Sequence, residues 1–201
     1  KYNKQYIQIA KKLQDQAMIG RGYNNLSAAL GEIGNNYEAI DSLKRGLLLI
    51  HSDNLFAKAK LTSNIGFCYR NLREYEKALQ FHREALRIKK EAKMSSSLAY
   101  SLGAIGRAHL GLGNTDSAIF YTQQEYELAL NYKIPYQIVD GVAHLSDAYE
   151  AAGDYQNALK YLHIKEGISD SLYYAEVESN MLLYQQKFDL SQKEREVDQL
   201  R

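Results

Sequence analysis

The chain has 201 residues, with 25 Lys and Arg against 24 Asp and Glu, and it contains one proline, one cysteine and no tryptophan. The formal net charge of +1 argues against direct nucleic-acid binding, because such proteins carry a clear basic excess. The lone cysteine excludes an internal disulfide and a cysteine-based zinc site, and no stretch reaches the ~18–20 apolar residues of a membrane span.

The expected elements, taken in chain order, are all helices. A single proline among many Ala, Leu, Gln, Lys and Glu residues indicates an all-α fold with short turns. Gly34, Gly113 and Gly153 are expected to end helices in the left-handed conformation, and the Asn or Asp that follows each of them should cap the next helix. Pro135 is expected in the first turn of its helix. We predict helices over 2–14, 16–33, 37–51, 54–72, 75–91, 95–112, 115–131, 135–152 and 155–168.

The chain repeats itself with a period of about 40 residues. The segments NIGFCYRNLREYEKAL (64–79), AIGRAHLGLGNTDSAI (104–119) and HLSDAYEAAGDYQNAL (144–159) share one pattern, and NLSAALGEIGNNYEAI (25–40) fits it after the loss of one turn residue. The equivalent alanines are Ala39, Ala78, Ala118 and Ala158. Small residues at these positions and at Gly66 or Gly106 let paired helices approach closely.

This pattern resembles the tetratricopeptide repeat (TPR). The small residue of the family's Leu-Gly pair matches Gly66 and Gly106, and the aromatic that follows matches Tyr69 and Tyr149. The resemblance covers residues 16–170 and implies a right-handed superhelical α-solenoid of helix pairs. We divide the chain into the second helix of a truncated upstream repeat (1–15), four repeats (16–53, 54–94, 95–134 and 135–170) and a capping helix that extends toward an absent downstream domain (171–201).

The C-terminal segment departs from the repeat. No Gly, Pro or Asn lies between Met181 and Arg201, so residues 175–201 are predicted to form one long helix. Residues 169–200 resemble the end of the TPR sensor region of bacterial two-component histidine kinases. A similar arrangement precedes the effector part of some bacterial helix-turn-helix regulators. A homodimer through residues 188–201 is a further expectation.

Catalytic chemistry finds no support in the sequence. The five histidines form no metal-binding pair, His109 is expected in the core, and Cys68 is expected to be a small buried residue. Gly111-Leu112-Gly113 lies at a helix end where the repeat itself requires glycine, so it does not indicate a phosphate loop. We therefore predict no enzyme activity for this fragment, no cofactor and no metal, although a full-length protein could carry a kinase domain.

The remaining candidate is a groove for a protein or peptide partner. In the family, the first helix of each repeat lines the concave face, and its ligand-contacting offsets carry over to twelve positions. The first three repeats place basic residues there and the fourth places acidic ones, which would orient an extended peptide. The alternative is a solvated inner face. The candidate binding residues are Arg21, Asn24, Lys60, Asn64, Phe67, Arg70, Tyr100, Arg107, Asp140, His144, Asp147 and Glu150.

The sequence thus predicts a non-catalytic TPR interaction module. Its expected setting is the sensor or regulatory region of a bacterial signal-transduction histidine kinase, on the periplasmic side of the membrane. Two alternatives stay open: the TPR region of a cytoplasmic, peptide-responsive transcriptional regulator, and a plain structural scaffold.

Overall fold

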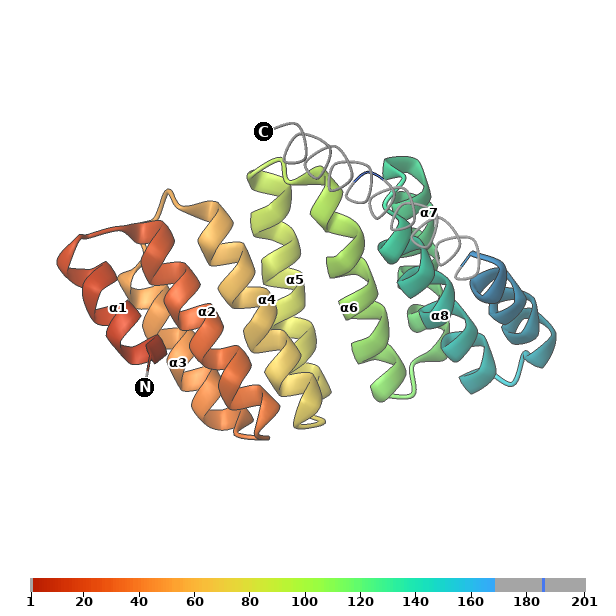
Figure 1. Cartoon of the computed structure of the whole chain (residues 1–201). Helices are drawn as coiled ribbons and strands as arrows, with labels where there is room; N and C mark the ends of the chain where they lie inside the picture. Colours follow the sequence, from red (N-terminus) through yellow and green to blue (C-terminus); the bar gives the residue numbers. More distant parts are fainter. Residues whose placement is uncertain (1, 169–185, 187–201) are drawn as a thin grey trace, which may run out of the picture.

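The computed structural model describes residues 2–168 and residue 186, and in this part of the chain all regular structure is helical (Figure 1). The helices follow the predicted ones closely. The exception is the start of the sixth, where residues 95–97 form a separate 3₁₀ turn. The elements are α1 (Tyr2–Lys12), α2 (Gln16–Glu32), α3 (Asn36–Leu49), α4 (Leu55–Asn71), α5 (Tyr75–Glu91), η1 (Ser95–Ser97), α6 (Leu98–Gly111), α7 (Thr115–Tyr132), α8 (Pro135–Ala151) and a further helix over 155–168.

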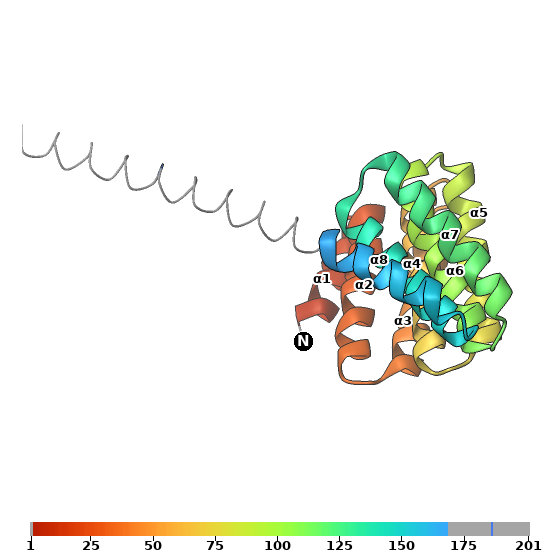
Figure 2. The same cartoon turned by 90° about the vertical axis from the view of Figure 1, so that its right-hand side faces the viewer.

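The helices form two layers that curve toward one side. Each of α2, α4 and α6 contacts the next even-numbered helix through its backbone, whereas α3 and α5, and likewise α5 and α7, make no such backbone contact among the described residues. The even-numbered helices are therefore closer together and form the inner layer of a curved stack. Figure 2 shows the helix pairs stacked behind one another. This arrangement confirms the predicted all-α solenoid, and we call the surface of α2, α4, α6 and α8 the inner face.

Short turns join the helices of each pair. Gly34, Gly113 and Gly153 have φ values of +80°, +76° and +78°, as predicted, because glycine adopts this conformation without steric cost. Arg73 occupies the same turn position with φ +60°, a backbone conformation that is unfavourable for a residue with a Cβ. The predicted caps are confirmed only in part. Asp154 accepts a hydrogen bond from the backbone of Asn157 at 3.1 Å, while the Asn residues that follow Gly34 and Gly113 make no side-chain capping bond.

Small residues set the distance between paired helices. Ala39, Ala78 and Ala118 are completely buried, and a Cβ added at Gly106 would lie 3.3 Å from the carbonyl oxygen of Ala118. Larger side chains here would separate the helices, so the close pairing depends on these positions. His109, predicted in the core, is buried and its ring stacks on Tyr121.

Some expectations concern residues that the structure does not describe. The dimer contact over 188–201 lies outside the described residues, and so do the predicted helix over 175–201 and the capping segment 171–201, apart from residue 186. The division into four repeats remains a prediction. Within the described part of the chain, no helix is both long and apolar enough to cross a membrane.

Candidate binding groove

Three cavities follow one another along the inner face. The first lies between α2 and α4 and has a volume of about 340 Å³; the second, beside α4 and α6, has about 400 Å³; the third, reaching α8, has about 40 Å³. Phe56 and Lys60 line both the first and the second, and Tyr100 lines both the second and the third. Because neighbouring cavities share lining residues, they lie side by side along the inner layer, and we call this row of cavities the groove.

We name each cavity by the helices or the charged residues that line it. The α2–α4 cavity is lined by Ala17, Gly20, Arg21, Asn54, Phe56, Ala57, Lys60 and Leu61. The Lys89 cavity is lined by Phe56, Lys60, Ser63, Asn64, Lys89, Met94, Ser97, Tyr100 and Gln137. The arginine cavity is lined by Phe67, Arg70, His82, Tyr100, Ala104, Arg107, Glu125, Asp140 and His144.

A chain of hydrogen bonds crosses the arginine cavity from α6 to α8 to α7. The Nη1 atom of Arg107 donates to Nε2 of His144 at 3.0 Å, and Nδ1 of His144 lies 2.8 Å from Oε2 of Glu125. A guanidinium can only donate, so Nε2 must accept, and the proton of a neutral His144 ring then lies on Nδ1 and is donated to Glu125. Glu125 is 3% exposed, and burial raises the pKa of its carboxyl group.

The cavity also has an unpaired positive charge. The guanidinium of Arg70 stands 4.8 Å from the ring centroid of Phe67. Burial, together with the charge of Arg107, lowers the pKa of Arg70. No ion pair among the described residues includes Arg70. Burial lowers the pKa of neighbouring His82 to about 3, and both arginines contribute to this shift, so the ring is neutral at physiological pH.

The structure brings most of the predicted groove residues together. The arginine cavity contains Phe67, Arg70, Tyr100, Arg107, Asp140 and His144, and the Lys89 cavity contains Lys60, Asn64 and Tyr100. Arg21 lines the α2–α4 cavity, and Asn24 accepts a hydrogen bond from Asn64 at 2.5 Å.

Two of the three acidic residues predicted at one end of the groove lie outside the three cavities. Asp147 and Glu150 are exposed and line none of the three cavities. Asp140 shares the arginine cavity with two arginines. The predicted separation into a basic part and an acidic part is therefore incomplete.

Sequence reasoning missed the buried groove residues His82, Lys89 and Glu125, because the family offsets lie on the inner helices only. These three come from α5 and α7 of the outer layer. A signal was nevertheless present. Lys89 occupies the repeat position at which the adjacent repeats have the buried apolar residues Ile50 and Ala129. Glu125 occupies the position at which the adjacent repeats have Ala85 and Lys165. A charged residue at a buried repeat position needs a partner, and this points to the groove.

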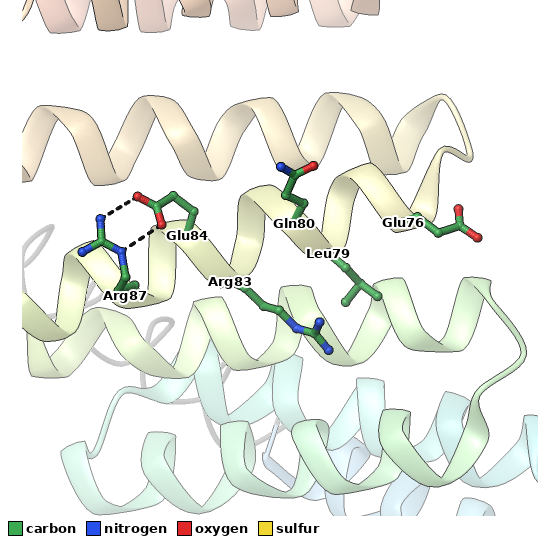
Figure 3. Close-up of a pocket in the computed structure, with 6 residues that line it drawn as sticks. All are labelled: Glu76, Leu79, Gln80, Arg83, Glu84 and Arg87. Atoms are coloured by element: carbon green, nitrogen blue, oxygen red, sulfur yellow. Dashed lines mark hydrogen bonds and ion pairs between the residues drawn. The ribbon is translucent and has the colours of Figure 1, made fainter.

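The outer layer has a larger but different hollow on α5. It has a volume of about 690 Å³ and is lined by Glu76, Leu79, Gln80, Arg83, Glu84 and Arg87 (Figure 3). Arg87 donates to both carboxylate oxygens of Glu84, at 2.7 and 2.9 Å, as the dashed lines in Figure 3 show. Arg87 is thus already paired with a carboxylate, unlike Arg70 on the inner face.

Metal-binding groups are not assembled in the described part of the chain. No group of three or more His, Cys, Asp or Glu residues there could hold a metal ion. Cys68 is buried, and burial raises the pKa of its thiol, so little of it is the reactive thiolate.

Comparisons with known proteins support the helical-repeat fold. Residues 56–131 match the family model described as tetratricopeptide repeat. This segment of the chain therefore carries tetratricopeptide repeats. A search among curated protein sequences finds no match. The TPR match spans α4 to α7 and therefore includes most of the Lys89 and arginine cavities.

Solved structures show the same TPR-like solenoid. BtubC (BKLC) from P. vanneervenii superposes with a TM-score of 0.69 at 19% identity, over 79% of this chain and 66% of BtubC. The STAND protein PH0952 from Pyrococcus horikoshii, which has a tetratricopeptide repeat sensor, gives 0.71 at 20% identity, over 85% of this chain and 27% of PH0952. A Rap protein complexed with competence and sporulation factor gives 0.67 at 16% identity, over 77% of this chain and 44% of Rap.

Proposed function

We propose that this TPR module binds an extended polypeptide segment along its inner face and has no catalytic activity. The observation that carries the proposal is the row of three adjacent cavities, in which Phe56 and Lys60 line the first two and Tyr100 lines the last two. A succession of small cavities along a curved face suits side chains that project in turn from an extended chain.

The character of the groove favours an acidic segment. Phe56 is 65% exposed and Tyr100 is 45% exposed, so both rings are available for contact. Arg70 is half-buried and has no carboxylate partner among the described ion pairs, in contrast to Arg87 on the outer face. A partly desolvated cation gains more from an incoming carboxylate than a solvated and already paired one does.

The test compares one inner and one outer arginine. A phage-displayed library of dodecapeptides is selected against the wild-type chain, and the affinities of selected peptides are measured by calorimetry for Arg70→Gln and Arg87→Gln. Arg70→Gln leaves the hydrogen bonds of Arg107, His144 and Glu125 in place, so it probes binding with little effect on folding.

We expect Arg70→Gln to weaken binding by about tenfold, which corresponds to ~1.4 kcal/mol, because it removes one charge-assisted contact. Arg87→Gln should leave the affinity unchanged. Equal effects of the two substitutions, or no selected peptide at all, would contradict the assignment of the inner face as the binding groove.

We further propose that the module is the sensor or regulatory region of a bacterial signal-transduction histidine kinase, with the groove on the periplasmic side. The resemblance of residues 169–200 to the end of such sensor regions supports this role, and the TPR sensor of PH0952 offers a parallel. The test is to add a selected peptide to the full-length protein and to measure autophosphorylation. A change that Arg70→Gln suppresses is expected, and no change would argue for a scaffold.

A second candidate is the TPR region of a peptide-responsive transcriptional regulator in the cytoplasm. The structural similarity to a Rap protein that was solved with competence and sporulation factor favours it. For this candidate, the selected peptide should alter the DNA affinity of the full-length protein and leave its phosphorylation state unchanged.

A further inference from the structure

The Lys89 cavity contains a buried cation with an unused hydrogen-bond donor. Lys89 is 5% exposed, and its Nζ atom donates to Oγ of Ser101 at 2.7 Å and to the carbonyl oxygen of Ser97 at 3.2 Å. An ammonium group has three N–H donors, so one is left over. In the region that the structure describes, no carboxylate forms an ion pair with Lys89.

The charge state of Lys89 fits this isolated position. Burial lowers the pKa of its amine to about 8, and no neighbouring charge contributes resolvably to the shift. The amine thus remains mostly protonated near neutral pH but gains strongly from an added negative charge. The ring of Tyr100, 5.3 Å away, gives the cation its only aromatic neighbour within the described cation–π contacts.

Two further polar atoms in the same cavity are buried without partners. They are Oγ of Ser63, on α4, and Oε1 of Gln137, on α8. A buried hydroxyl and a buried carbonyl oxygen destabilise the protein when no hydrogen bond satisfies them. Since both line a cavity of about 400 Å³ rather than a closed core, a ligand can satisfy them.

The walls define what kind of group fits between these polar atoms. Phe56, Met94 and Tyr100 provide apolar surface, and Lys60 adds a second positive charge at the rim. Apolar walls suit methylene groups, whereas the unused Lys89 donor and the Ser63 hydroxyl suit a carboxylate. The orphan oxygen of Gln137 can accept a backbone N–H.

We propose that the Lys89 cavity is a subsite for an acidic side chain of the bound polypeptide. The carboxylate accepts from Nζ of Lys89 and from the hydroxyl of Ser63, while a backbone N–H of the polypeptide donates to Oε1 of Gln137. This inference rests on the proposed function, because it names the residue class that the groove selects at one position.

The probes for the test are two capped pentapeptides and a free acid. Acetyl-Ala-Ala-Glu-Ala-Ala-amide, its Gln twin and glutarate are titrated into the chain labelled with ¹³C-lysine. The Cε resonance of Lys89 is assigned by its loss in Lys89→Met. We expect the Glu pentapeptide to shift this resonance saturably, the Gln twin to bind at least tenfold more weakly, and glutarate to bind more weakly than the Glu peptide because it has no backbone N–H.

Variants test the residues that carry the proposal. Binding of the three probes to the variants is measured by calorimetry. Lys89→Met should abolish the preference for Glu over Gln, and the matched control Lys90→Met, which changes the exposed neighbour, should retain it. Ser63→Ala should weaken the Glu pentapeptide by about threefold and provides a second readout if Lys89→Met loses helical circular dichroism.

The outcomes separate this inference from the proposed function. Equal binding of the Glu and Gln pentapeptides, no shift with any probe, or a preference that survives Lys89→Met would overturn the subsite. Glutarate binding as tightly as the Glu pentapeptide would indicate a site for a free small acid and would overturn the polypeptide assignment. In these cases, selected dodecapeptides that still respond to Arg70→Gln would leave the proposed groove intact.

Discussion

The Gly141→Ala substitution tests how closely α7 and α8 must pack to hold the arginine cavity together. Gly141 lies on α8 against the backbone of α7. A Cβ added there would lie 2.9 Å from the Cα of Tyr126 and 3.1 Å from its backbone nitrogen. Ordinary van der Waals contact begins at 3.4 Å, so the two helices must separate by about 0.5 Å.

The expected cost follows from two opposing effects. Overpacking against backbone atoms costs ~2 kcal/mol, whereas replacing Gly by Ala in a helix gains ~1 kcal/mol, which leaves a net loss of roughly 1 kcal/mol. The same separation would stretch the 2.8 Å contact between His144 and Glu125, because His144 follows Gly141 by one helical turn and Glu125 precedes Tyr126. Hydrogen bonds of this kind weaken beyond ~3.2 Å.

Urea unfolding followed by circular dichroism at the helical band measures the effect. Because repeat proteins can unfold in more than one step, midpoints are compared. With a typical slope of ~2 kcal/mol per molar urea, Gly141→Ala should lower the midpoint by about 0.5 M.

Gly31→Ala is the matched control. It places the same Cβ on helix α2, where no atom lies within 4 Å, so it should leave the midpoint unchanged or raise it. A midpoint for Gly141→Ala equal to or above that of Gly31→Ala would refute the reasoning, since the packing cost would then be absent.

Two predictions concern pH. Burial raises the pKa of Glu125 above its ordinary 4.5, so its contribution to stability declines as the pH rises from 4.5 through the raised native value. Glu125→Gln removes this titration, and its urea midpoint relative to wild type should therefore rise between pH 4.5 and 7.5; a constant difference would contradict the assignment. The pKa of His82 falls from 6.5 to about 3 in the native state, so its contribution is lost as the pH falls from 6.5 toward 3. The ring resonances of His82 in NMR spectra should stay constant from pH 8 to about 4.5, and a titration midpoint above pH 5 would show that the ring is more accessible than the structure indicates.

The turn positions show which backbone conformations can be predicted from the residue type alone. Gly113 and Gly153 predicted left-handed helix ends, and the structure has them there because steric freedom is a property of the residue itself. Arg73 adopts the same conformation without being glycine. The residue type alone would not have identified this turn.

The groove contains contacts that the sequence pattern does not predict. The offsets that the TPR resemblance implies placed Phe67, Arg70 and Arg107 on the inner face, and the structure has all three lining the arginine cavity. The repeat offsets do not indicate that Glu125 on α7 contacts His144 on α8. They also do not indicate that Lys89 extends from the outer layer into the cavity beside Tyr100. These contacts depend on how residues distant in sequence are brought together.

The sequence by itself determined the helices, the turns and the 40-residue period, since each depends on steric preferences and apolar spacing within a few residues. Only the tertiary structure decided which charges are buried, which of them are paired and which polar atoms are left without partners. The free energy of a buried charge depends on its whole surroundings, and for Lys89 these come from α4, α5, α6 and α8 together.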